Sequence, residues 1–156
     1  MGLFKRILVA IDFSDFSQEA IRISSGLANA FGGEVLVLHV CKTHRAVDPT
    51  LLAARSKAVN SMLELQKEMA KEASKRLEEW IGYLQWGTAE VKTEVASGAP
   101  YKVITNRAKE IGADLIVMGS YGRSGFARML IGSTTEKVVR KATCPVLSVN
   151  LPALAK

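Results

Sequence analysis

The chain has 156 residues, of which 48% are hydrophobic and 23% charged, and it carries a formal net charge of +6. This composition predicts one globular domain over residues 1–156, and the two cysteines, Cys41 and Cys144, lack the spacing of a zinc site or a disulfide framework. No apolar run has the length of a secretion signal or a membrane span, so we expect a cytoplasmic protein with reduced thiols and no membrane contact.

The first part of the chain has the pattern strand, helix, strand. An apolar run at residues 6–11 predicts a strand that is buried on both faces. Asp12 and Ser14 are candidate N-caps for a helix that Gly32-Gly33 ends. A second buried strand is predicted at residues 35–40. Two such strands joined by a helix favour parallel pairing with a right-handed crossover.

The middle of the chain, residues 50–86, has apolar side chains at helical spacing between polar faces of glutamate and lysine. One helix over this stretch would be about 50 Å long, more than a domain of this size usually needs. We therefore expect the core-packed part to begin near Ser61, with residues 49–60 separate or projecting. A coiled coil that binds a partner is the alternative, but Gln66 interrupts its seam.

The last part of the chain continues the alternation of strands and helices. Residues 89–96 alternate polar and apolar side chains, as an edge strand with one wetter face does. Four further elements follow: a helix from Pro100 to Gly112, a strand at 114–118, a helix at 134–142 and a strand at 145–149. This order predicts an α/β fold with an open, doubly wound sheet of five parallel strands and helices on both faces.

A glycine-rich segment, Gly119 to Ser133, separates the fourth strand from the last helix. Glycine lets backbone N–H groups approach a ligand that a Cβ would keep away, and a helix starting after Gly132 adds further free donors. Two such donor clusters at one gap predict an anion site, most naturally for phosphates. The segment matches neither the P-loop nor the G-x-G-x-x-G fingerprint, and a purely structural turn is the alternative.

The basic residues concentrate in the same part of the chain, with five of them against one acidic residue between Gly119 and Cys144. A polyphosphate ligand accounts for part of this excess. Only Tyr121 and Phe126 offer aromatic stacking here, and no nucleic-acid-binding module is recognisable. Nucleic acid is therefore not an expected partner.

The spacing Gly119-x2-Gly122-x9-Gly132-Ser133 resembles the nucleotide-binding signature of the universal stress protein family, in its ATP-binding branch. The segments Ile7–Ser14, Val35–Val40, Ala113–Gly119 and Cys144–Val149 look like the family's first, second, fourth and last strands with their turns. The resemblance covers nearly the whole chain outside residues 42–88. It implies the strand order 3-2-1-4-5, in which the winding reverses between strands one and four and Asp12 lies opposite Gly119.

The resemblance also implies roles for individual residues in a site for ATP and Mg²⁺. The adenine is expected against Ala10, Ile11, Val40 and Met118, near the turn at Gly98. Asp12 would hydrogen-bond the ribose or help to hold Mg²⁺, although helix capping is its ordinary alternative. The phosphates are expected at Gly119, Ser120, Gly122, Arg123, Gly132, Ser133 and Thr134, with the Ser133 and Thr134 hydroxyls also capping the last helix. Two residues depart from the family pattern, Tyr121 where histidine is common and Thr134 where a small apolar residue is usual.

We expect an ATP-binding regulatory protein of the stress response with no catalytic residues, because Asp12 is the one carboxylate in the site region and His39 and His44 lie elsewhere. The alternatives are a slow ATPase or self-phosphorylating enzyme, with Ser120 and Ser133 as hypothetical phosphorylation sites, and an interaction module that needs no nucleotide. The resemblance further implies a homodimer that pairs the edge strand Pro145–Val149 with its copy. Other protein partners remain unidentified.

Overall fold

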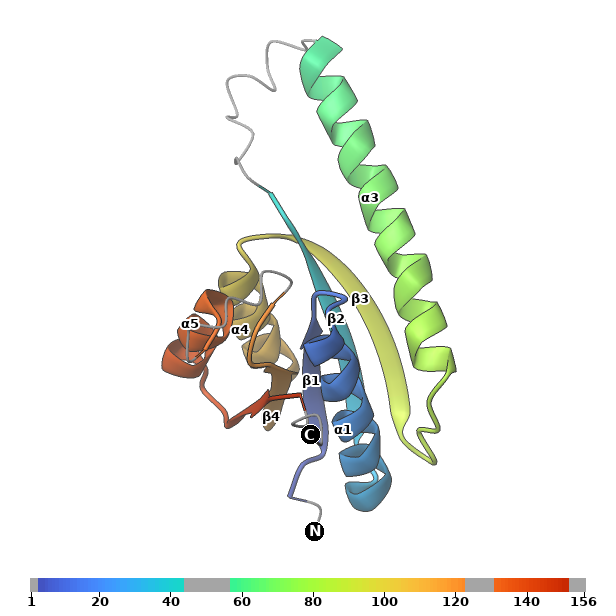
Figure 1. Cartoon of the computed structure of the whole chain (residues 1–156), viewed down its shortest axis with the longest axis vertical. Coiled ribbons are helices and arrows are strands. Elements are labelled where there is room, and N and C mark those ends of the chain that lie inside the picture. Colours follow the sequence, from blue (N-terminus) through green and yellow to red (C-terminus); the bar gives the residue numbers. More distant parts are fainter. Residues whose placement is uncertain (1–2, 44–56, 123–130, 152–156) are drawn as a thin grey trace, which may run out of the picture.

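The fold is built on one sheet of five parallel strands (Figure 1). The computed structural model describes residues 3–43, 57–122 and 131–151. The elements in chain order are β1 (Arg6–Ile11), α1 (Asp15–Phe31), β2 (Glu34–Lys42), α3 (Lys57–Gly82), β3 (Glu90–Gly98), α4 (Pro100–Ile111), β4 (Leu115–Gly119), α5 (Ser133–Lys141) and β5 (Val146–Val149). The sheet order is β3-β2-β1-β4-β5. The predicted α/β class and strand order are confirmed.

The sheet separates two hydrophobic cores, because successive side chains of a strand point to opposite faces. In β1, Ile7, Val9 and Ile11 pack toward α1 and α3, whereas Leu8 and Ala10 pack toward α4 and α5. Figure 1 shows these two helix pairs on opposite sides of the sheet. The central strands β1 and β4 are buried along almost their whole length, which agrees with their uninterrupted apolar sequences.

Local signals in the sequence set the ends of α1 and α4. Ser14 is the N-cap of α1, and its hydroxyl accepts a hydrogen bond from the Ser17 N–H at 3.2 Å. Gly32 ends that helix in the left-handed conformation, with φ 65°. Pro100 opens α4 and Gly112, with φ 62°, ends it. The predictions for these four positions are confirmed.

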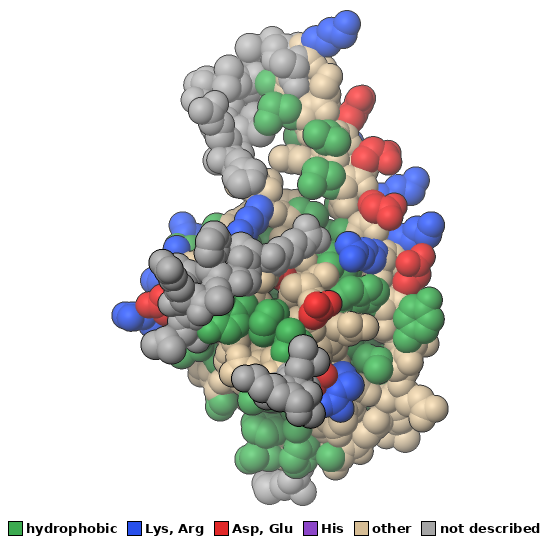
Figure 2. Space-filling model, viewed as in Figure 1, with side chains coloured by type: hydrophobic (Ala, Val, Ile, Leu, Met, Phe, Trp, Pro, Cys, Tyr) green, Lys and Arg blue, Asp and Glu red, His purple; other side chains and the backbone are tan. Residues whose placement is uncertain are grey.

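Helix α3 differs from the prediction. It is continuous from Lys57 to Gly82, and its first side chain in the core beneath α1 is Leu77. Ser61, near which core packing was expected to begin, is exposed, although Val59 before it is 8% exposed. Three hydrophobic side chains of its first half are between 48% and 61% exposed, namely Met62, Leu65 and Met69. Figure 1 shows this half extending past the sheet, and Figure 2 shows hydrophobic side chains along it.

The projecting half of α3 is helical for a reason that does not depend on the core. Glutamate precedes lysine by three residues at 64/67 and 68/71, and again at 72/75 in the second half, and such pairs stabilise a solvated helix. The helix therefore runs beyond the strands it covers. Across the described residues, no helix is both long enough and apolar enough to cross a membrane.

The two edges of the sheet differ in polarity. In β3, Val91 and Val95 pack against the core beneath α1 and α3, while Glu94 on the other face pairs with Arg107 of α4 at 2.8 Å. This alternation confirms the predicted edge strand with one wetter face. At the opposite edge, β5 is hydrogen-bonded to β4, and its Leu147 side chain is 37% exposed.

Candidate functional site

The turn after β1 and the loop after β4 meet where the winding of the sheet reverses. β1 pairs with β2 on one side and with β4 on the other, so the chain leaves β1 and β4 side by side. Beyond this edge, the Asp12 carboxylate faces the backbone of Gly122. A Cβ built on Gly122 would lie 2.8 Å from Oδ2 of Asp12. Such edges, at the carboxyl ends of parallel strands, are the usual ligand sites of open α/β sheets.

Asp12 is held by the start of α1. Its backbone N–H donates to the Ser17 hydroxyl at 2.8 Å, and its Oδ1 accepts from that hydroxyl at 2.7 Å and from the Ser14 N–H at 3.1 Å. The helix cap is Ser14, so Asp12 does not have the capping role that was its alternative. These bonds fix the carboxylate group, with Oδ2 on the side of Gly122.

Gly119 and Ser120 tie the glycine-rich loop to the body of the protein. Ser120 is only 4% exposed, its N–H donates to the Val149 carbonyl at 2.8 Å, and its carbonyl accepts from the Gly132 N–H at 2.7 Å. Its hydroxyl accepts from Ser148 at 3.0 Å. A Cβ at Gly119 would lie 2.6 Å from Cβ of Phe16. Gly119 therefore fixes the start of the loop against α1, and the hydrogen bond between Ser120 and Gly132 joins the start of the loop to its end.

Helix α5 begins without a side-chain cap. Its N-cap is Gly132, so the expectation that the Ser133 and Thr134 hydroxyls cap this helix is wrong: both residues lie inside its first turn. The first N–H groups of a helix have no intrahelical acceptor, and Gly132 has no side chain to accept from them. The helix start is a cluster of donors at the positive end of the helix dipole. A Cβ at Gly132 would lie 3.1 Å from the Ser120 carbonyl oxygen.

The four apolar residues expected around an adenine do not share one face. Ala10 and Met118 are direct neighbours in the sheet, and both belong with Val40 to the core beneath α4 and α5. Ile11 belongs to the opposite core, and its carbonyl lies 2.9 Å from Nδ1 of His39. All four are at most 9% exposed. Only three of the four side chains could therefore line one common surface.

Gly98 is the last residue of β3, the strand next to β2, and it lies at the same edge of the sheet. It has φ 144°, and a Cβ there would lie 3.0 Å from Cγ2 of Val103. Ala99 follows as the N-cap of α4, again without a side-chain hydrogen bond. The start of α4 thus lies beyond the end of β3, as the start of α5 lies beyond the end of β4.

The described residues include no group of three or more His, Cys, Asp or Glu side chains that would hold a metal ion. Asp12 is the carboxylate that the structure places at the glycine loop, while Arg123 lies outside the described residues. Burial raises the pKa of the Cys41 and Cys144 thiols above the ordinary value, so neither is activated as a nucleophile.

Two residues that support the site were not predicted. Thr135 is 3% exposed and donates its hydroxyl hydrogen bond to the Gly119 carbonyl at 2.8 Å, which joins α5 to the end of β4. Ser148 bonds Ser120 from β5. A signal for Ser148 existed in the sequence, because it is a polar residue within an otherwise apolar strand.

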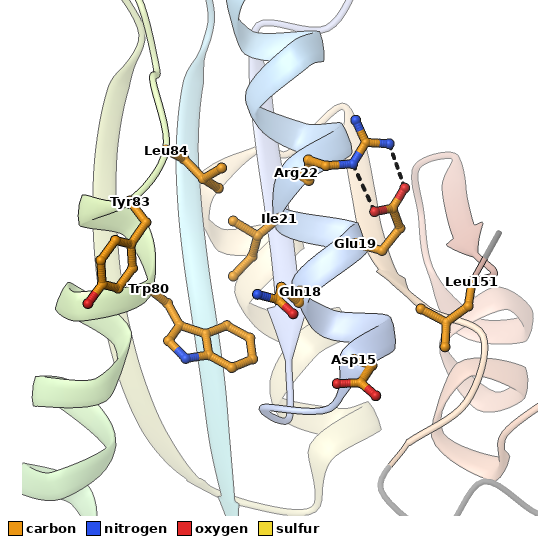
Figure 3. Close-up of a pocket in the computed structure, with 9 residues that line it drawn as sticks. All are labelled: Asp15, Gln18, Glu19, Ile21, Arg22, Trp80, Tyr83, Leu84 and Leu151. Carbon is orange, nitrogen blue, oxygen red and sulfur yellow. Dashed lines mark hydrogen bonds and ion pairs between the residues drawn. The ribbon is translucent and has the colours of Figure 1, made fainter. Parts of the chain in front are cut away.

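A separate groove of about 430 Å³ lies between α1 and the end of α3 (Figure 3). Its lining residues are Asp15, Gln18, Glu19, Ile21, Arg22, Trp80, Tyr83, Leu84 and Leu151. None of the predicted site residues lines this groove, so it is distinct from the site at the glycine loop.

Comparison with known proteins gives consistent matches. The model of the universal stress protein family matches residues 3–150. Universal stress protein MJ0531 of Methanocaldococcus jannaschii is 35% identical over 151 residues, which cover 97% of this chain and 85% of that protein. A solved structure of hypothetical protein MJ0577, from the same organism, has a TM-score of 0.79 at 29% identity and covers 96% of this chain and 98% of that chain.

A third match is a universal stress protein from Archaeoglobus fulgidus, solved in complex with dAMP. It has a TM-score of 0.57 at 24% identity and covers 95% of this chain and 99% of that chain. At this identity the match supports the fold.

Proposed function

Because this chain belongs to the universal stress protein family, we propose that it is an ATP-binding regulatory protein of the stress response. The nucleotide would lie across the carboxyl ends of β1 and β4. The observation that carries the proposal is the meeting of Asp12 with Gly122, where a carboxylate adjoins a backbone that has no room for a Cβ. The resemblance of the glycine spacing to the ATP-binding branch supports the choice of nucleotide.

The phosphates would be held by backbone donors. Gly122 and Gly132 have no side chains that would keep a phosphate away from the backbone at these two positions. The start of α5 supplies the N–H groups of Ser133 and Thr134. In this arrangement Gly119 and Ser120 serve as the frame of the loop, because the Ser120 N–H and carbonyl already bond within the protein. The hydroxyls of Ser133 and Thr134, which are not needed as caps, would donate to phosphate oxygens.

The adenine would lie beside Ala10, Val40 and Met118, between the end of β2 and the turn at Gly98. Ile11 would contribute through its position in the backbone, since its side chain packs on the other face. The dAMP complex of the Archaeoglobus fulgidus protein is an example of this fold holding an adenine nucleotide.

Asp12 would bind the ribose hydroxyls or a water of Mg²⁺. One carboxylate suits Mg²⁺ that is held mainly by phosphate oxygens and water, which is a common arrangement for this ion. When bound, the ion would neutralise charge on the phosphates. Asp12 would orient it or the ribose through the oxygen that faces Gly122.

Binding without rapid hydrolysis is the function this arrangement favours. The Oδ1 atom of Asp12 accepts two hydrogen bonds from Ser14 and Ser17, which hold the carboxylate in place. A general base for ATP hydrolysis must instead take a proton from a positioned water. We therefore propose that the protein responds to nucleotide and turns it over slowly at most.

The β5 edge is the proposed dimer contact. It is a short and mostly apolar strand at the edge of the sheet, and within the described residues it pairs with β4 alone, an arrangement that proteins normally cover. Pairing with its own copy would give a symmetric dimer. Sedimentation as a monomer at micromolar concentration would contradict this part of the proposal.

The central experiment is chromatography of the small molecules that the purified protein releases on heating, beside a thermal-shift titration with Mg²⁺-ATP. We expect released ATP or a rise in melting temperature, since a ligand at 100 times its Kd stabilises a protein by about 2.7 kcal/mol. GTP and sodium sulfate at equal concentration serve as controls for base and phosphate. No released nucleotide and no shift would leave the loop with a structural role alone, whereas phosphate release above that of Asp12→Ala would favour a slow ATPase.

A further inference from the structure

The turn between β1 and α1 contains a bulky residue in an unusual conformation. Phe13 has φ 63°, and it is the one non-glycine residue with positive φ in the described part of the chain. Residues with a Cβ rarely adopt positive φ, and they do so where the surrounding structure holds the backbone in that conformation. Phe13 directly follows Asp12, the carboxylate of the proposed nucleotide site.

Three side chains surround the Phe13 ring. The Trp80 ring meets it edge to face with centroids 5.2 Å apart, and the His39 ring lies 4.6 Å away. Cζ of Arg76 stands 4.5 Å from the ring centroid, in the geometry of a cation–π contact. We call His39, Arg76 and Trp80 the Phe13 clamp. Figure 3 shows the Trp80 indole pointing from α3 toward α1.

The clamp lies on the opposite side of the turn from the proposed nucleotide. Phe13 packs with the core beneath α1 and α3, whereas Oδ2 of the preceding Asp12 faces Gly122. His39 also lies with Nδ1 2.9 Å from the Ile11 carbonyl, so the clamp contacts the chain on both sides of Asp12. Displacing the Phe13 ring would turn the peptide that carries the carboxylate.

We propose that Phe13 is a positioning residue for the nucleotide site: the Phe13 clamp holds its left-handed backbone, and this backbone aims Asp12 at the ligand. The proposal rests on the proposed function and adds a role for α3. Two of the three clamp residues belong to α3, which has no residue in the nucleotide site itself. The docking of α3 on the sheet therefore contributes to nucleotide affinity.

A purely structural role for Phe13 makes a different prediction. If the ring only filled the core, its removal would lower the stability of the protein but leave the affinity of the folded molecules unchanged. A positioning role requires that affinity fall, and that the fall depend on Asp12. The two roles are separated by a double-mutant cycle.

The experiment measures the Kd of Mg²⁺-ATP by calorimetry for the wild type, Phe13→Ala, Asp12→Ala and the double variant, at a temperature where each is folded. We expect Phe13→Ala to raise the Kd about tenfold and to have less than about a twofold effect in the Asp12→Ala background. Phe13→Tyr, which keeps the ring, should bind like the wild type. An unchanged Kd in Phe13→Ala, or equal losses in both backgrounds, would overturn the positioning role.

A second pair of variants covers the case in which Phe13→Ala does not fold. Arg76→Met keeps the stem and the helix but removes the cation over the ring, and Lys75→Met removes the same charge from the neighbouring exposed position. We expect about a threefold rise in Kd for Arg76→Met and none for Lys75→Met. Equal changes in both would assign the effect to net charge and contradict the proposal. If the wild type itself binds no ATP, the proposed function fails, whatever these variants do.

Discussion

The Oδ2 atom of Asp12 lies so close to the backbone of Gly122 that a Cβ at position 122 would be 2.8 Å from it. The contact joins the turn after β1 to the loop after β4 and leaves no space for a side chain. A methyl group there must displace either the carboxylate or the loop. The pair therefore brings the two halves of the proposed nucleotide site into contact.

Gly122→Ala should lower affinity for Mg²⁺-ATP by about tenfold or more, which is about 1.4 kcal/mol. The matched control is Gly26→Ala in α1, where a Cβ would have open space within 4 Å. The control should keep its affinity and gain about 0.5–1 kcal/mol in stability, because alanine favours a helix more than glycine does. Calorimetry and urea unfolding check both variants, and equal affinities would contradict the proposed site.

Thr135→Val should destabilise the protein by about 1–3 kcal/mol, because it leaves the buried Gly119 carbonyl without the hydroxyl that bonds it at 2.8 Å. The control is Thr105→Val, whose hydroxyl bonds the carbonyl of Tyr101 one turn earlier in its own helix. That variant should change stability by less than about 0.5 kcal/mol. Equal losses of unfolding free energy in the two variants would show that the hydrogen bond between α5 and β4 stabilises the protein no more than a bond within one helix.

Leucine-to-alanine substitutions at the two ends of α3 should differ sharply in effect. Leu77 is 0% exposed and Leu65 is 61% exposed. Leu77→Ala should cost about 2–5 kcal/mol through lost burial and a cavity, and Leu65→Ala less than about 0.5 kcal/mol. Similar unfolding midpoints for the two variants would mean that the projecting half of α3 is covered in solution.

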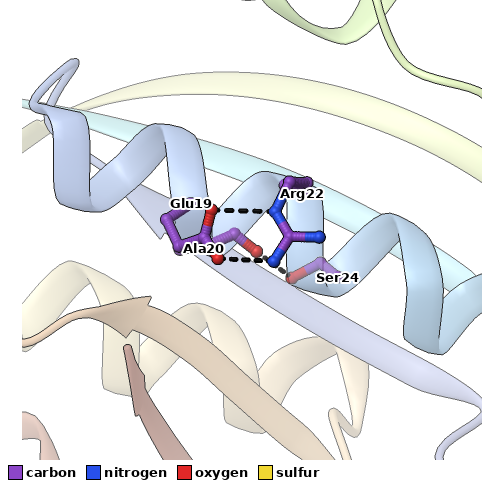
Figure 4. Close-up of polar contacts among 4 residues, drawn as sticks. All are labelled: Glu19, Ala20, Arg22 and Ser24. Carbon is purple, nitrogen blue, oxygen red and sulfur yellow. Dashed lines mark hydrogen bonds and ion pairs between the residues drawn. The ribbon is translucent and has the colours of Figure 1, made fainter. Parts of the chain in front are cut away.

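Glu19 and Arg22 form a pair on α1, with Nε of Arg22 2.8 Å from Oε2 of Glu19 (Figure 4). The hydrogen bond from Arg22 lowers the pKa of Glu19 below its ordinary value. A lowered folded-state pKa stabilises the protein above the unfolded value, about 4.3, and the effect is lost as the pH falls through the folded value.

Because Arg22 is largely exposed, the pair should make only a small contribution to the free energy of unfolding. Glu19→Gln should show this small deficit in urea unfolding at pH 7 and lose it as the pH falls below the lowered pKa of Glu19. A deficit that persisted at low pH would exclude the charge of Glu19 as its cause.

Much of the fold was predictable because particular residues have narrow backbone roles. Ser14, Gly32, Pro100 and Gly112 lie at the ends of α1 and α4 because caps, left-handed turns and first helical positions select these residue types. The start of core packing in α3 was not predictable in the same way. A helix stabilised by its own glutamate and lysine pairs has the same pattern whether or not a sheet lies beneath it.

The candidate site was likewise predictable only in part. The order of strands brings Asp12 and the loop after β4 together, and simple alternation already separates Ile11 from Ala10. The conformation of Phe13 could not be predicted from the sequence, because phenylalanine has no intrinsic preference for positive φ. Likewise, the burial of Ser120 depends on contacts with Ser148 and Val149, which come from a strand distant in the sequence.

The position of β1 at the centre of the sheet has a consequence for synthesis on the ribosome. The N–H of Arg6 donates to the Asp114 carboxylate, 108 residues later in the chain, at the start of the β1 and β4 pairing. At about 5–20 residues per second, β1 waits roughly 5–20 s for its second neighbour. Until then one edge of a strand that is apolar from Ile7 to Ile11 is open, so the nascent chain should be most dependent on chaperones in the interval before β4 emerges.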